Sequence, residues 1–277
     1  MHQLTVGSLG APATGQRGYN PAHMSDVFGE TTSELQAIIL AGGKGERLRP
    51  YTDDRPKPMV PILDKPILEY QVRWLASQGV RRLVISCGYR HEVIQRYFAG
   101  GEKFGVEIRY AIEDEPLGRG GGLKLAWTHL EPGSGPIIAT NGDVMTSFPL
   151  APMLEAHRRA RAMASLLVVP FVSQYGIVDL DETAEPGASA ARVVGFRSEP
   201  VLPYWVNGGV YVLEPAVREL LPDRGDHEES TFPQLAREGT LLAYKSNAFW
   251  RAVDTVKDLT AVRDHLMRQL LQAFLGT

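Results

Sequence analysis

The chain has 277 residues, of which 44% are hydrophobic and 22% charged, with a formal net charge of -3. This composition is typical of one large or two closely joined globular α/β domains, and it lacks the clustered basic excess of a nucleic-acid-binding surface. The one cysteine, Cys87, excludes an internal disulfide and suits a reducing cytoplasm; because it ends an apolar run, we interpret it as a buried thiol. No apolar stretch reaches the length of a membrane span.

The first part of the chain differs in composition from the rest. Residues 1–33 are rich in Gly, Ala, Pro, Ser and Thr and lack the apolar core of a signal peptide. We interpret them as a disordered extension and expect the folded domain to occupy residues 34–277.

The fold is predicted to begin with a buried strand that leads into a glycine-rich loop. Residues 35–41 form an apolar run typical of a parallel strand, and Gly42, Gly43, Lys44 and Gly45 follow at once. Glycines let backbone N–H groups approach an anion, and basic side chains neutralise its charge. The loop is neither a Walker P-loop nor a dinucleotide fingerprint, and taken alone it is equally compatible with an ordinary tight turn. Its position after a strand favours a polyphosphate site.

Helices and strands then alternate along the chain. In the first half we predict a helix at 67–78, a strand at 83–87, a helix at 91–98, and strands at 106–112 and 136–140 separated by a helix. In the second half we predict a helix at 152–161, strands at 165–171, 175–180, 192–196 and 206–213, and a final helix at 255–275. Such alternation indicates βαβ units and a mostly parallel α/β sheet.

The most specific pattern lies between Leu35 and Pro66. It reads G-G-x-G-x-R-L-x-P, followed by a threonine, P-K-P-M and K-P. This pattern resembles the signature of the sugar-1-phosphate nucleotidylyltransferases. The resemblance implies a Rossmann-like, GT-A-like sheet flanked by helices with a smaller acceptor-binding lobe. We therefore divide the nucleotidyltransferase domain into a nucleotide-binding half at 34–150, an acceptor-binding half at 151–254 and a C-terminal helix at 255–277.

A second glycine-rich segment follows the strand at 106–112. Residues 116–123 read P-L-G-R-G-G-G-L and match the family segment P-L-G-T-[AG]-G-A-L, with Arg119 in place of threonine. Such a run is by itself also typical of a flexible loop. The resemblance implies that the two segments bind the nucleotide through Leu40, Ala41, Gly42, Gly43, Lys44, Gly45, Glu113, Pro116, Gly118, Gly120 and Gly121.

Two aspartates are the expected metal ligands. Asp143 ends the strand motif N-G-D, which by itself also fits a turn. Asp254 lies in F-W-R-A-V-D-T-V-K-D, which is similar to the F-W-x-x-M-D-T-x-x-D of glucose-1-phosphate cytidylyltransferases, and it also fits a helix N-cap. The resemblance implies that Asp143 and Asp254 hold Mg²⁺. It further implies that Arg47 stabilises the leaving pyrophosphate and that Lys57 contacts the reacting phosphates.

The acceptor half follows the family less closely. Residues 207–209 read N-G-G and match the family's N-[AG]-G, whose asparagine and glycine contact the sugar. Residues 196–200, F-R-S-E-P, replace the family's F-x-E-K-P, so Glu199 stands where a lysine holds the sugar-bound phosphate. Either Arg197 takes over, or the acceptor carries a cationic group, or the site is impaired. We expect the acceptor to contact Tyr175, Gly176, Arg197, Glu199, Asn207 and Gly208.

The predicted activity is Mg²⁺-dependent transfer of a nucleoside monophosphate from an NTP to a sugar 1-phosphate, and the C-terminal match favours CTP with a hexose 1-phosphate. The alternatives are a mannose- or heptose-1-phosphate guanylyltransferase, a cytidylyltransferase for an amine-bearing phosphate or phosphonate, and a catalytically impaired nucleotide-sugar-binding regulatory protein. A glycosyltransferase is least favoured, because N-G-D lacks the first aspartate of D-x-D. We expect a cytoplasmic homo-oligomer that acts on small molecules, without nucleic acid or membrane as a partner.

Overall fold

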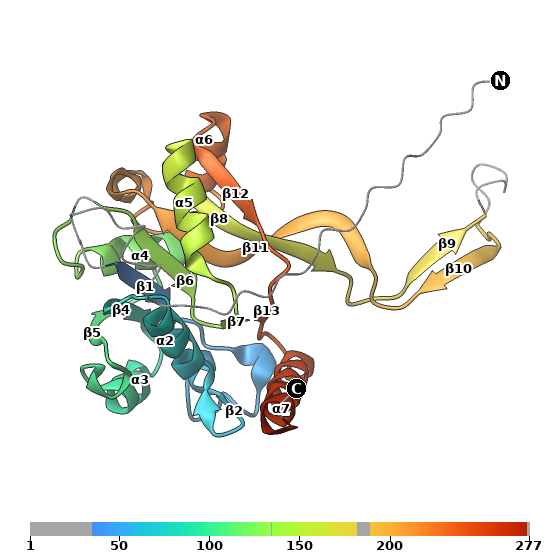
Figure 1. The fold of residues 1–277 in the computed structure, drawn as a ribbon, viewed down its shortest axis with the longest axis horizontal. Coiled ribbons are helices and arrows are strands. Elements are labelled where there is room, and N and C mark those ends of the chain that lie inside the picture. The colour runs from blue at the N-terminus through green and yellow to red at the C-terminus, as the bar shows by residue number, and fades with distance from the viewer. Residues whose placement is uncertain (1–34, 134, 182–188, 276–277) are drawn as a thin grey trace. The chain divides into compact units, whose positions relative to one another are not determined.

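A computed structural model describes residues 35–275 except 134 and 182–188, so the predicted extension at 1–33 lies outside the described residues. Its central sheet contains seven strands: β1 (Gln36–Leu40), β4 (Arg82–Cys87), β5 (Glu107–Ile112), β6 (Ile137–Asn141), β8 (Ala164–Val172), β11 (Val201–Leu213) and β12 (Leu241–Lys245). Their order is β12-β8-β11-β6-β1-β4-β5 (Figure 1). Within this sheet β11 is antiparallel to both of its neighbours and all other pairs are parallel. The predicted mostly parallel α/β fold is confirmed.

The helices are α2 (Ile67–Ser77), α3 (His91–Phe98), α4 (Gly118–Trp127), α5 (Leu150–Ala160), α6 (Thr231–Arg237) and α7 (Val256–Leu275). Three small strand pairs lie outside the central sheet: β2 (Pro61–Ile62) with β3 (Lys65–Pro66), β7 (Val144–Thr146) with β13 (Trp250–Ala252), and β9 (Ile177–Leu180) with β10 (Val193–Arg197). Among the described helices, none combines the length and the apolar character needed to cross a membrane.

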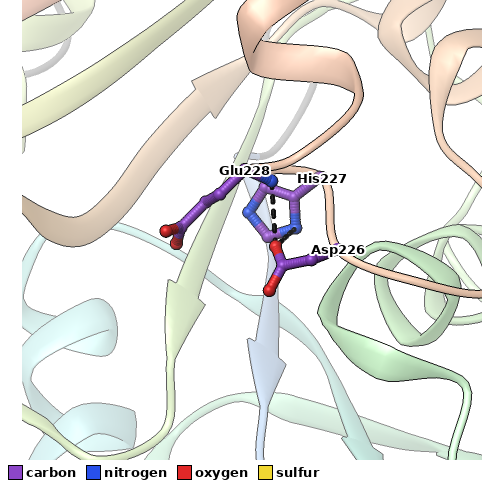
Figure 2. A group of neighbouring side chains, drawn as sticks. All are labelled: Asp226, His227 and Glu228. Atoms are coloured by element: carbon purple, nitrogen blue, oxygen red, sulfur yellow. Dashed lines mark hydrogen bonds and ion pairs between the residues drawn. The ribbon is translucent and has the colours of Figure 1, made fainter.

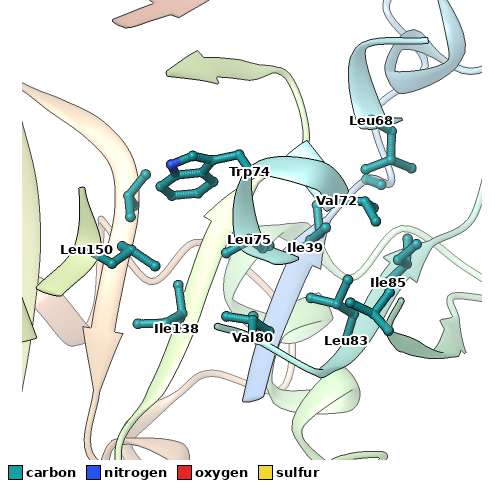
Figure 3. Packing of buried hydrophobic residues seen from close by; sticks show 14 of the residues in the cluster. Ile39, Leu68, Val72, Trp74, Leu75, Val80, Leu83, Ile85, Ile138 and Leu150 are labelled. Atoms are coloured by element: carbon teal, nitrogen blue, oxygen red, sulfur yellow. The ribbon is translucent and has the colours of Figure 1, made fainter. Parts of the chain in front are cut away.

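Helices cover both faces of the sheet. Successive side chains of a strand point to opposite faces, and on β1 the side chains on both faces are apolar and buried. On β1, Ile39 belongs to the core formed with α2, α3 and α5, whereas Ile38 belongs to the core formed with α4 and α6. Figure 3 shows Leu68, Val72 and Leu75 of α2 packed over the first of these faces. Both faces of β1 are therefore buried, which explains why its sequence reads as a continuous apolar run rather than as an alternating one.

The second half contains a β-ribbon that leaves the main sheet. β9 and β10 pair with each other in antiparallel register, and Figure 1 shows them extending beyond the ends of β8 and β11. Several of their apolar side chains are exposed, among them Val194 and Phe196. The predicted strands at 175–180 and 192–196 thus exist, but they form an arm rather than a part of the central sheet.

Helix α7 docks through its first half. Val262 is fully buried, and Leu259 and Leu266 pack against the small core formed by the 48–67 segment and Val253. Farther along the helix Leu270 is 58% exposed. The first half of α7, which follows Asp254, is therefore covered by the body of the domain.

Candidate active site

The site lies at the carboxyl edge of the parallel part of the sheet. The loops that follow β1, β4, β5 and β6 converge there around a cavity of about 1130 Å³, which is the edge where open α/β sheets bind ligands. The cavity is lined by many of the residues predicted from sequence: Leu40, Gly42, Gly43, Lys44, Gly45, Arg47, Lys57, Glu113, Pro116, Gly118, Asp143, Asn207 and Asp254. Its volume is large enough for two small-molecule substrates.

Four of these residues form one charged cluster. The Nζ atom of Lys57 donates hydrogen bonds to Asp143 Oδ2 and Asp254 Oδ1, both at 2.6 Å, and Arg47 Nη2 donates to the same oxygen of Asp254 at 2.8 Å. Lys57 is 8% exposed, whereas the two carboxylates are about one-third exposed and face the cavity. The structure thus brings together the four residues predicted to be catalytic, from three distant parts of the chain.

A short strand pair brings the two aspartates together. β7 follows Asp143 directly, β13 precedes Asp254, and the two strands pair in antiparallel register. The backbone N–H of Val253 donates to the carbonyl of Asp143 at 2.9 Å, which continues this pairing to the aspartates themselves. Asp258, at the start of α7, accepts hydrogen bonds from the N–H groups of Asp254 and Thr255. Backbone pairing and helix capping therefore hold Asp254 in place.

The first glycine loop has a packing requirement of its own. Gly45 has a φ of +72°, and a Cβ atom there would lie 2.6 Å from the Cβ atom of Lys57. Its carbonyl oxygen accepts a hydrogen bond from Thr52 Oγ1 at 2.9 Å. Only glycine combines that backbone angle with such close contact. Gly45 consequently lets the loop close over Lys57 and helps to fix the position of this lysine.

Glu113 supports both glycine segments. One carboxylate oxygen accepts from Ser86 Oγ at 3.0 Å, and the other accepts from the backbone N–H of Leu117 at 3.0 Å. Cβ atoms at Gly42 and Gly122 would lie 3.2 and 2.7 Å from the same carboxylate. Glu113 lines the cavity as predicted, but its hydrogen bonds go to the protein, where they position the two segments relative to each other.

The second glycine run is shaped mainly by a neighbouring loop. Cβ atoms at Gly118 and Gly121 would lie 2.5 Å from the carbonyl oxygens of Gly225 and Asp223, and the N–H of Gly120 donates to the Gly225 carbonyl at 2.9 Å. Gly118 lines the cavity, whereas Gly120 and Gly121 do not. The backbone of this glycine run is thus in close contact with the 222–227 segment of the protein. A contact between Gly120 or Gly121 and a nucleotide stays a prediction.

Most of the predicted acceptor residues lie away from the cavity. Tyr175 is 80% exposed beside the arm, the ring of Phe196 lies against Gly176, and Arg197 pairs with Asp179 of β9 at 2.7 Å. The structure therefore directs Arg197 to a partner on the arm.

Glu199 and Gly208 also have protein partners. Lys257, in the first turn of α7, donates to Glu199 Oε1 at 2.5 Å and holds the pKa of that carboxyl below its usual value. The negative charge that replaces the family lysine is therefore neutralised by a cation near Asp254. The carbonyl of Gly208 accepts from Trp250 Nε1 at 2.7 Å, which ties β11 to β13 at the cavity wall.

Sequence reasoning missed several cavity residues. Gly88 and Tyr89 follow β4, and Asn141 ends β6, so the rule that ligands bind at the carboxyl ends of parallel strands could have found them. Trp250 and Gly209 lie within the F-W-R-A-V-D-T and N-G-G motifs, but the sequence interpretation assigned neither of them a contact with a substrate. The buried Cys87 lies under this edge, and burial raises the pKa of its thiol to about 12, in agreement with an inert side chain.

A second cluster of potential ligands is already neutralised by the protein. Asp226, His227 and Glu228 form a turn beside the cavity, and Figure 2 shows the Asp226 carboxylate next to the His227 ring, where it accepts a hydrogen bond from the backbone N–H of Glu228. Arg119 forms ion pairs with Asp226 at 2.5 Å and with Glu228 at 2.7 Å, and the His227 ring packs edge-on against Tyr211. Because a guanidinium occupies the space between the carboxylates, we do not interpret this turn as a metal site.

Comparison with known proteins defines the class. The family model described as "Nucleotidyl transferase" matches residues 36–269, so the chain belongs to the nucleotidyl transferase family. The resemblance found in the sequence is thereby confirmed, and the match extends well beyond the glycine-rich loops that first indicated it.

Two relatives of the chain are named as mannose-1-phosphate guanylyltransferases. The chain is 36% identical over 230 residues to a mannose-1-phosphate guanyltransferase of Yarrowia lipolytica, covering 81% of this chain and 62% of that protein. It is 36% identical over 240 residues to mannose-1-phosphate guanylyltransferase 1 of Arabidopsis thaliana, covering 84% and 65%. The chain thus spans less than two thirds of the length of these curated relatives.

Solved structures agree with membership of the nucleotidyl transferase family. HddC from Yersinia pseudotuberculosis, crystallised with GMP-PN, superimposes with a TM-score of 0.65 at 25% identity and covers 84% of this chain and 99% of that one. A UDP-glucose pyrophosphorylase complexed with UDP-glucose, with a TM-score of 0.63 and 18% identity over 85% of this chain and 99% of that one, shares the fold.

Proposed function

We propose that the protein transfers GMP from GTP to mannose 1-phosphate or a closely related sugar 1-phosphate, with release of pyrophosphate. The observation that carries this proposal is the cluster of Arg47, Lys57, Asp143 and Asp254 on the wall of a cavity that the glycine-rich loop also lines. Nucleotidyl transfer needs this kind of site, because the protein contributes positioning and charge neutralisation rather than a nucleophile.

In the proposed reaction an oxygen of the acceptor phosphate attacks the α-phosphorus of GTP. A new P–O bond forms as the bond between the α-phosphorus and the bridging oxygen breaks, and that oxygen leaves with pyrophosphate. Lys57 would contact the α-phosphate and the acceptor phosphate, whereas Arg47 and Lys44 would neutralise the departing pyrophosphate. Lys57 and Arg47 now pair with carboxylates, so binding of the substrates would exchange these partners for phosphate oxygens.

The donor set fits a divalent cation. One oxygen of Asp143 and one of Asp254 lie 2.6 Å from a common point, the ammonium group of Lys57, so the two carboxylates already face a single positive charge. Mg²⁺ prefers one or two carboxylates together with substrate phosphates. A bound Mg²⁺ would supply further charge for the phosphates, and Asp143 and Asp254 are the residues that we propose to hold it.

The relatives support GTP rather than CTP. The sequence favoured CTP through the motif around Asp254, but the relatives at 36% identity are named as guanylyltransferases and the HddC crystals contained GMP-PN. The guanylyltransferase alternative therefore replaces the cytidylyltransferase interpretation in this proposal.

The remaining alternatives find less support. An acceptor with an amine was suggested by an unpaired Glu199, and this carboxylate pairs with Lys257. A protein without catalysis was suggested by the missing lysine, and the assembled charged cluster argues for activity. Assembly into a homo-oligomer and a cytoplasmic location stay predictions.

A pyrophosphate-release assay tests the proposal. GTP, CTP, UTP and dTTP are each combined with mannose, glucose and heptose 1-phosphates, with and without MgCl₂. We expect the highest kcat/KM for GTP with mannose or heptose 1-phosphate, and none without the metal. A clear preference for CTP would restore the first interpretation, and silence across the grid would refute nucleotidyl transfer to sugar phosphates.

A further inference from the structure

A chain of hydrogen bonds links the two halves of the site through Glu228. Its Oε1 atom accepts from Arg119 Nη1 at 2.7 Å, from Asn207 Nδ2 at 3.0 Å and from the hydroxyl of Tyr211 at 3.1 Å. Arg119 belongs to α4 and Asn207 to β11, and both line the cavity. Glu228 does not line it. Its carboxylate therefore contacts two residues of the cavity wall without lining the cavity itself.

The Glu228 carboxylate and the backbone N–H of Gly209 determine the orientation of the Asn207 amide, because the first only accepts and the second only donates. Tyr211 is fully buried, and burial raises its pKa well above the usual value, so the hydroxyl keeps its proton. The hydroxyl donates that proton to Glu228 and accepts from Asn207 Nδ2 at 2.9 Å. The other end of the amide, Oδ1, accepts from the backbone N–H of Gly209 at 2.9 Å. A flipped amide would place its oxygen against the Glu228 carboxylate and its NH₂ against the N–H of Gly209.

This arrangement decides which atom of Asn207 is available to a ligand. Its Nδ2 faces two protein acceptors within 3.0 Å, whereas Oδ1 receives one hydrogen bond and keeps a second lone pair. A group that binds to this side chain must therefore donate a hydrogen. A sugar hydroxyl meets that requirement, and a phosphate oxygen does not.

Arg119 balances the negative charge of Glu228. Its guanidinium neutralises the partly exposed Glu228 carboxylate, which also accepts the hydroxyl of the fully buried Tyr211. The guanidinium pairs with Glu228 and also with Asp226, so the turn at 226–228 is held to α4 even without Glu228. The two acidic residues thus share the arginine, but only Glu228 extends the network to Asn207.

We propose that Glu228 is a positioning residue that holds Asn207 with its Oδ1 atom available to the acceptor, so that this part of the site selects a sugar hydroxyl as hydrogen-bond donor. The inference rests on the proposed function, because it assigns one subsite of that reaction.

The test compares Glu228→Ala, Glu228→Gln and Asp226→Asn with the wild type in the pyrophosphate assay, with GTP and mannose 1-phosphate. We expect Glu228→Ala to raise KM for the sugar phosphate about tenfold, which is the value of one hydrogen bond to a charged group, with small changes in kcat and in KM for GTP. Glu228→Gln keeps an acceptor oxygen and should recover part of the loss. Asp226→Asn touches the same arginine but not Asn207, so KM should stay near the wild-type value.

A series of monodeoxy mannose 1-phosphates identifies the hydroxyl. Removal of the hydroxyl that contacts Asn207 should lower kcat/KM of the wild type about tenfold and that of Glu228→Ala much less. The missing hydroxyl and the Glu228→Ala substitution remove the same interaction, so their effects should not add. Equal losses in both proteins, or an unchanged KM in a folded Glu228→Ala variant, would overturn the inference alone. An inactive wild type would instead refute the proposed function, and the inference would fall with it. Thermal unfolding separates loss of fold from loss of binding.

Discussion

Replacement of Lys57 by methionine is the most direct test of the charged cluster. Methionine has similar length and no charge, so the packing of the side chain is largely kept. The change removes two hydrogen bonds of 2.6 Å and leaves the carboxylates of Asp143 and Asp254 facing each other, with Arg47 as the remaining cation. We expect three consequences, in stability, in the response to metal and in turnover.

The magnitude of the stability change follows from the exposure of the groups. A hydrogen bond to a charged group contributes about 1.5–3 kcal/mol, and water can partly replace the lysine because the two carboxylates are 30% and 35% exposed. We therefore expect the free energy of unfolding to fall by about 2 kcal/mol, or about 4–8 °C in Tm for a domain of this size. Excess MgCl₂ should raise the Tm of the variant more than that of the wild type, since the carboxylates have lost their cation.

Turnover should fall by about 10²–10³-fold, the usual cost of removing one preorganised charge contact from a transition state. Lys65→Met is the matched control, because Lys65 pairs with its exposed neighbour Asp64 and, among the described residues, with no other acid. We expect both its activity and its Tm to stay near the wild-type values. Near-normal activity of Lys57→Met would remove this lysine from the mechanism. An equal effect of MgCl₂ on the Tm of both proteins would argue against a metal site at the two aspartates.

Three further predictions concern packing, pH and the acceptor side. Gly121→Ala should lower the free energy of unfolding by about 1–3 kcal/mol in denaturant titrations, because its Cβ would lie 2.5 Å from a backbone carbonyl, whereas Gly43→Ala, with open space around it, should change stability little. Burial lowers the pKa of His227 from 6.5 to about 4, so the unfolded chain takes up the proton at a higher pH than the folded one. The free energy of unfolding should therefore fall by about 3 kcal/mol as the pH drops from 7 to 4, and His227→Phe should reduce this pH dependence. Lys257→Ala leaves the Glu199 carboxylate without its ion-pair partner, so its negative charge should repel the acceptor phosphate and raise KM, less so at high salt. The double variant that lacks both Lys257 and Glu199 should regain affinity for the acceptor. An unchanged KM in Lys257→Ala would place this pair outside the acceptor site.

The nucleotide half of the site could be predicted because its signal is local. An apolar strand followed by a glycine- and lysine-rich loop specifies both the element and the chemistry within a few residues, and the structure has β1 and the cavity loop where the sequence indicates them. The chain order of strands and helices likewise indicated the α/β class, since the periodicity of buried residues is a property of each segment by itself.

The acceptor half could not be predicted in the same way, because its geometry depends on pairings between distant segments. Antiparallel insertion of β11, the β9–β10 arm and the short β7–β13 pair have no local signature. For this reason Arg197, which is close to the acceptor motif in sequence, has its partner on the arm, whereas Lys257, from a different element, reaches Glu199.

The sequence by itself determined the family, the glycine-rich loop and the residue types of the charged cluster, because each of these is recognised from short local motifs. Only the tertiary structure decided that Lys57 stands between Asp143 and Asp254, and that Glu228 lies behind Asn207. Those contacts join residues far apart in the chain, and their distances are set by sheet order and backbone pairing, which no short motif records.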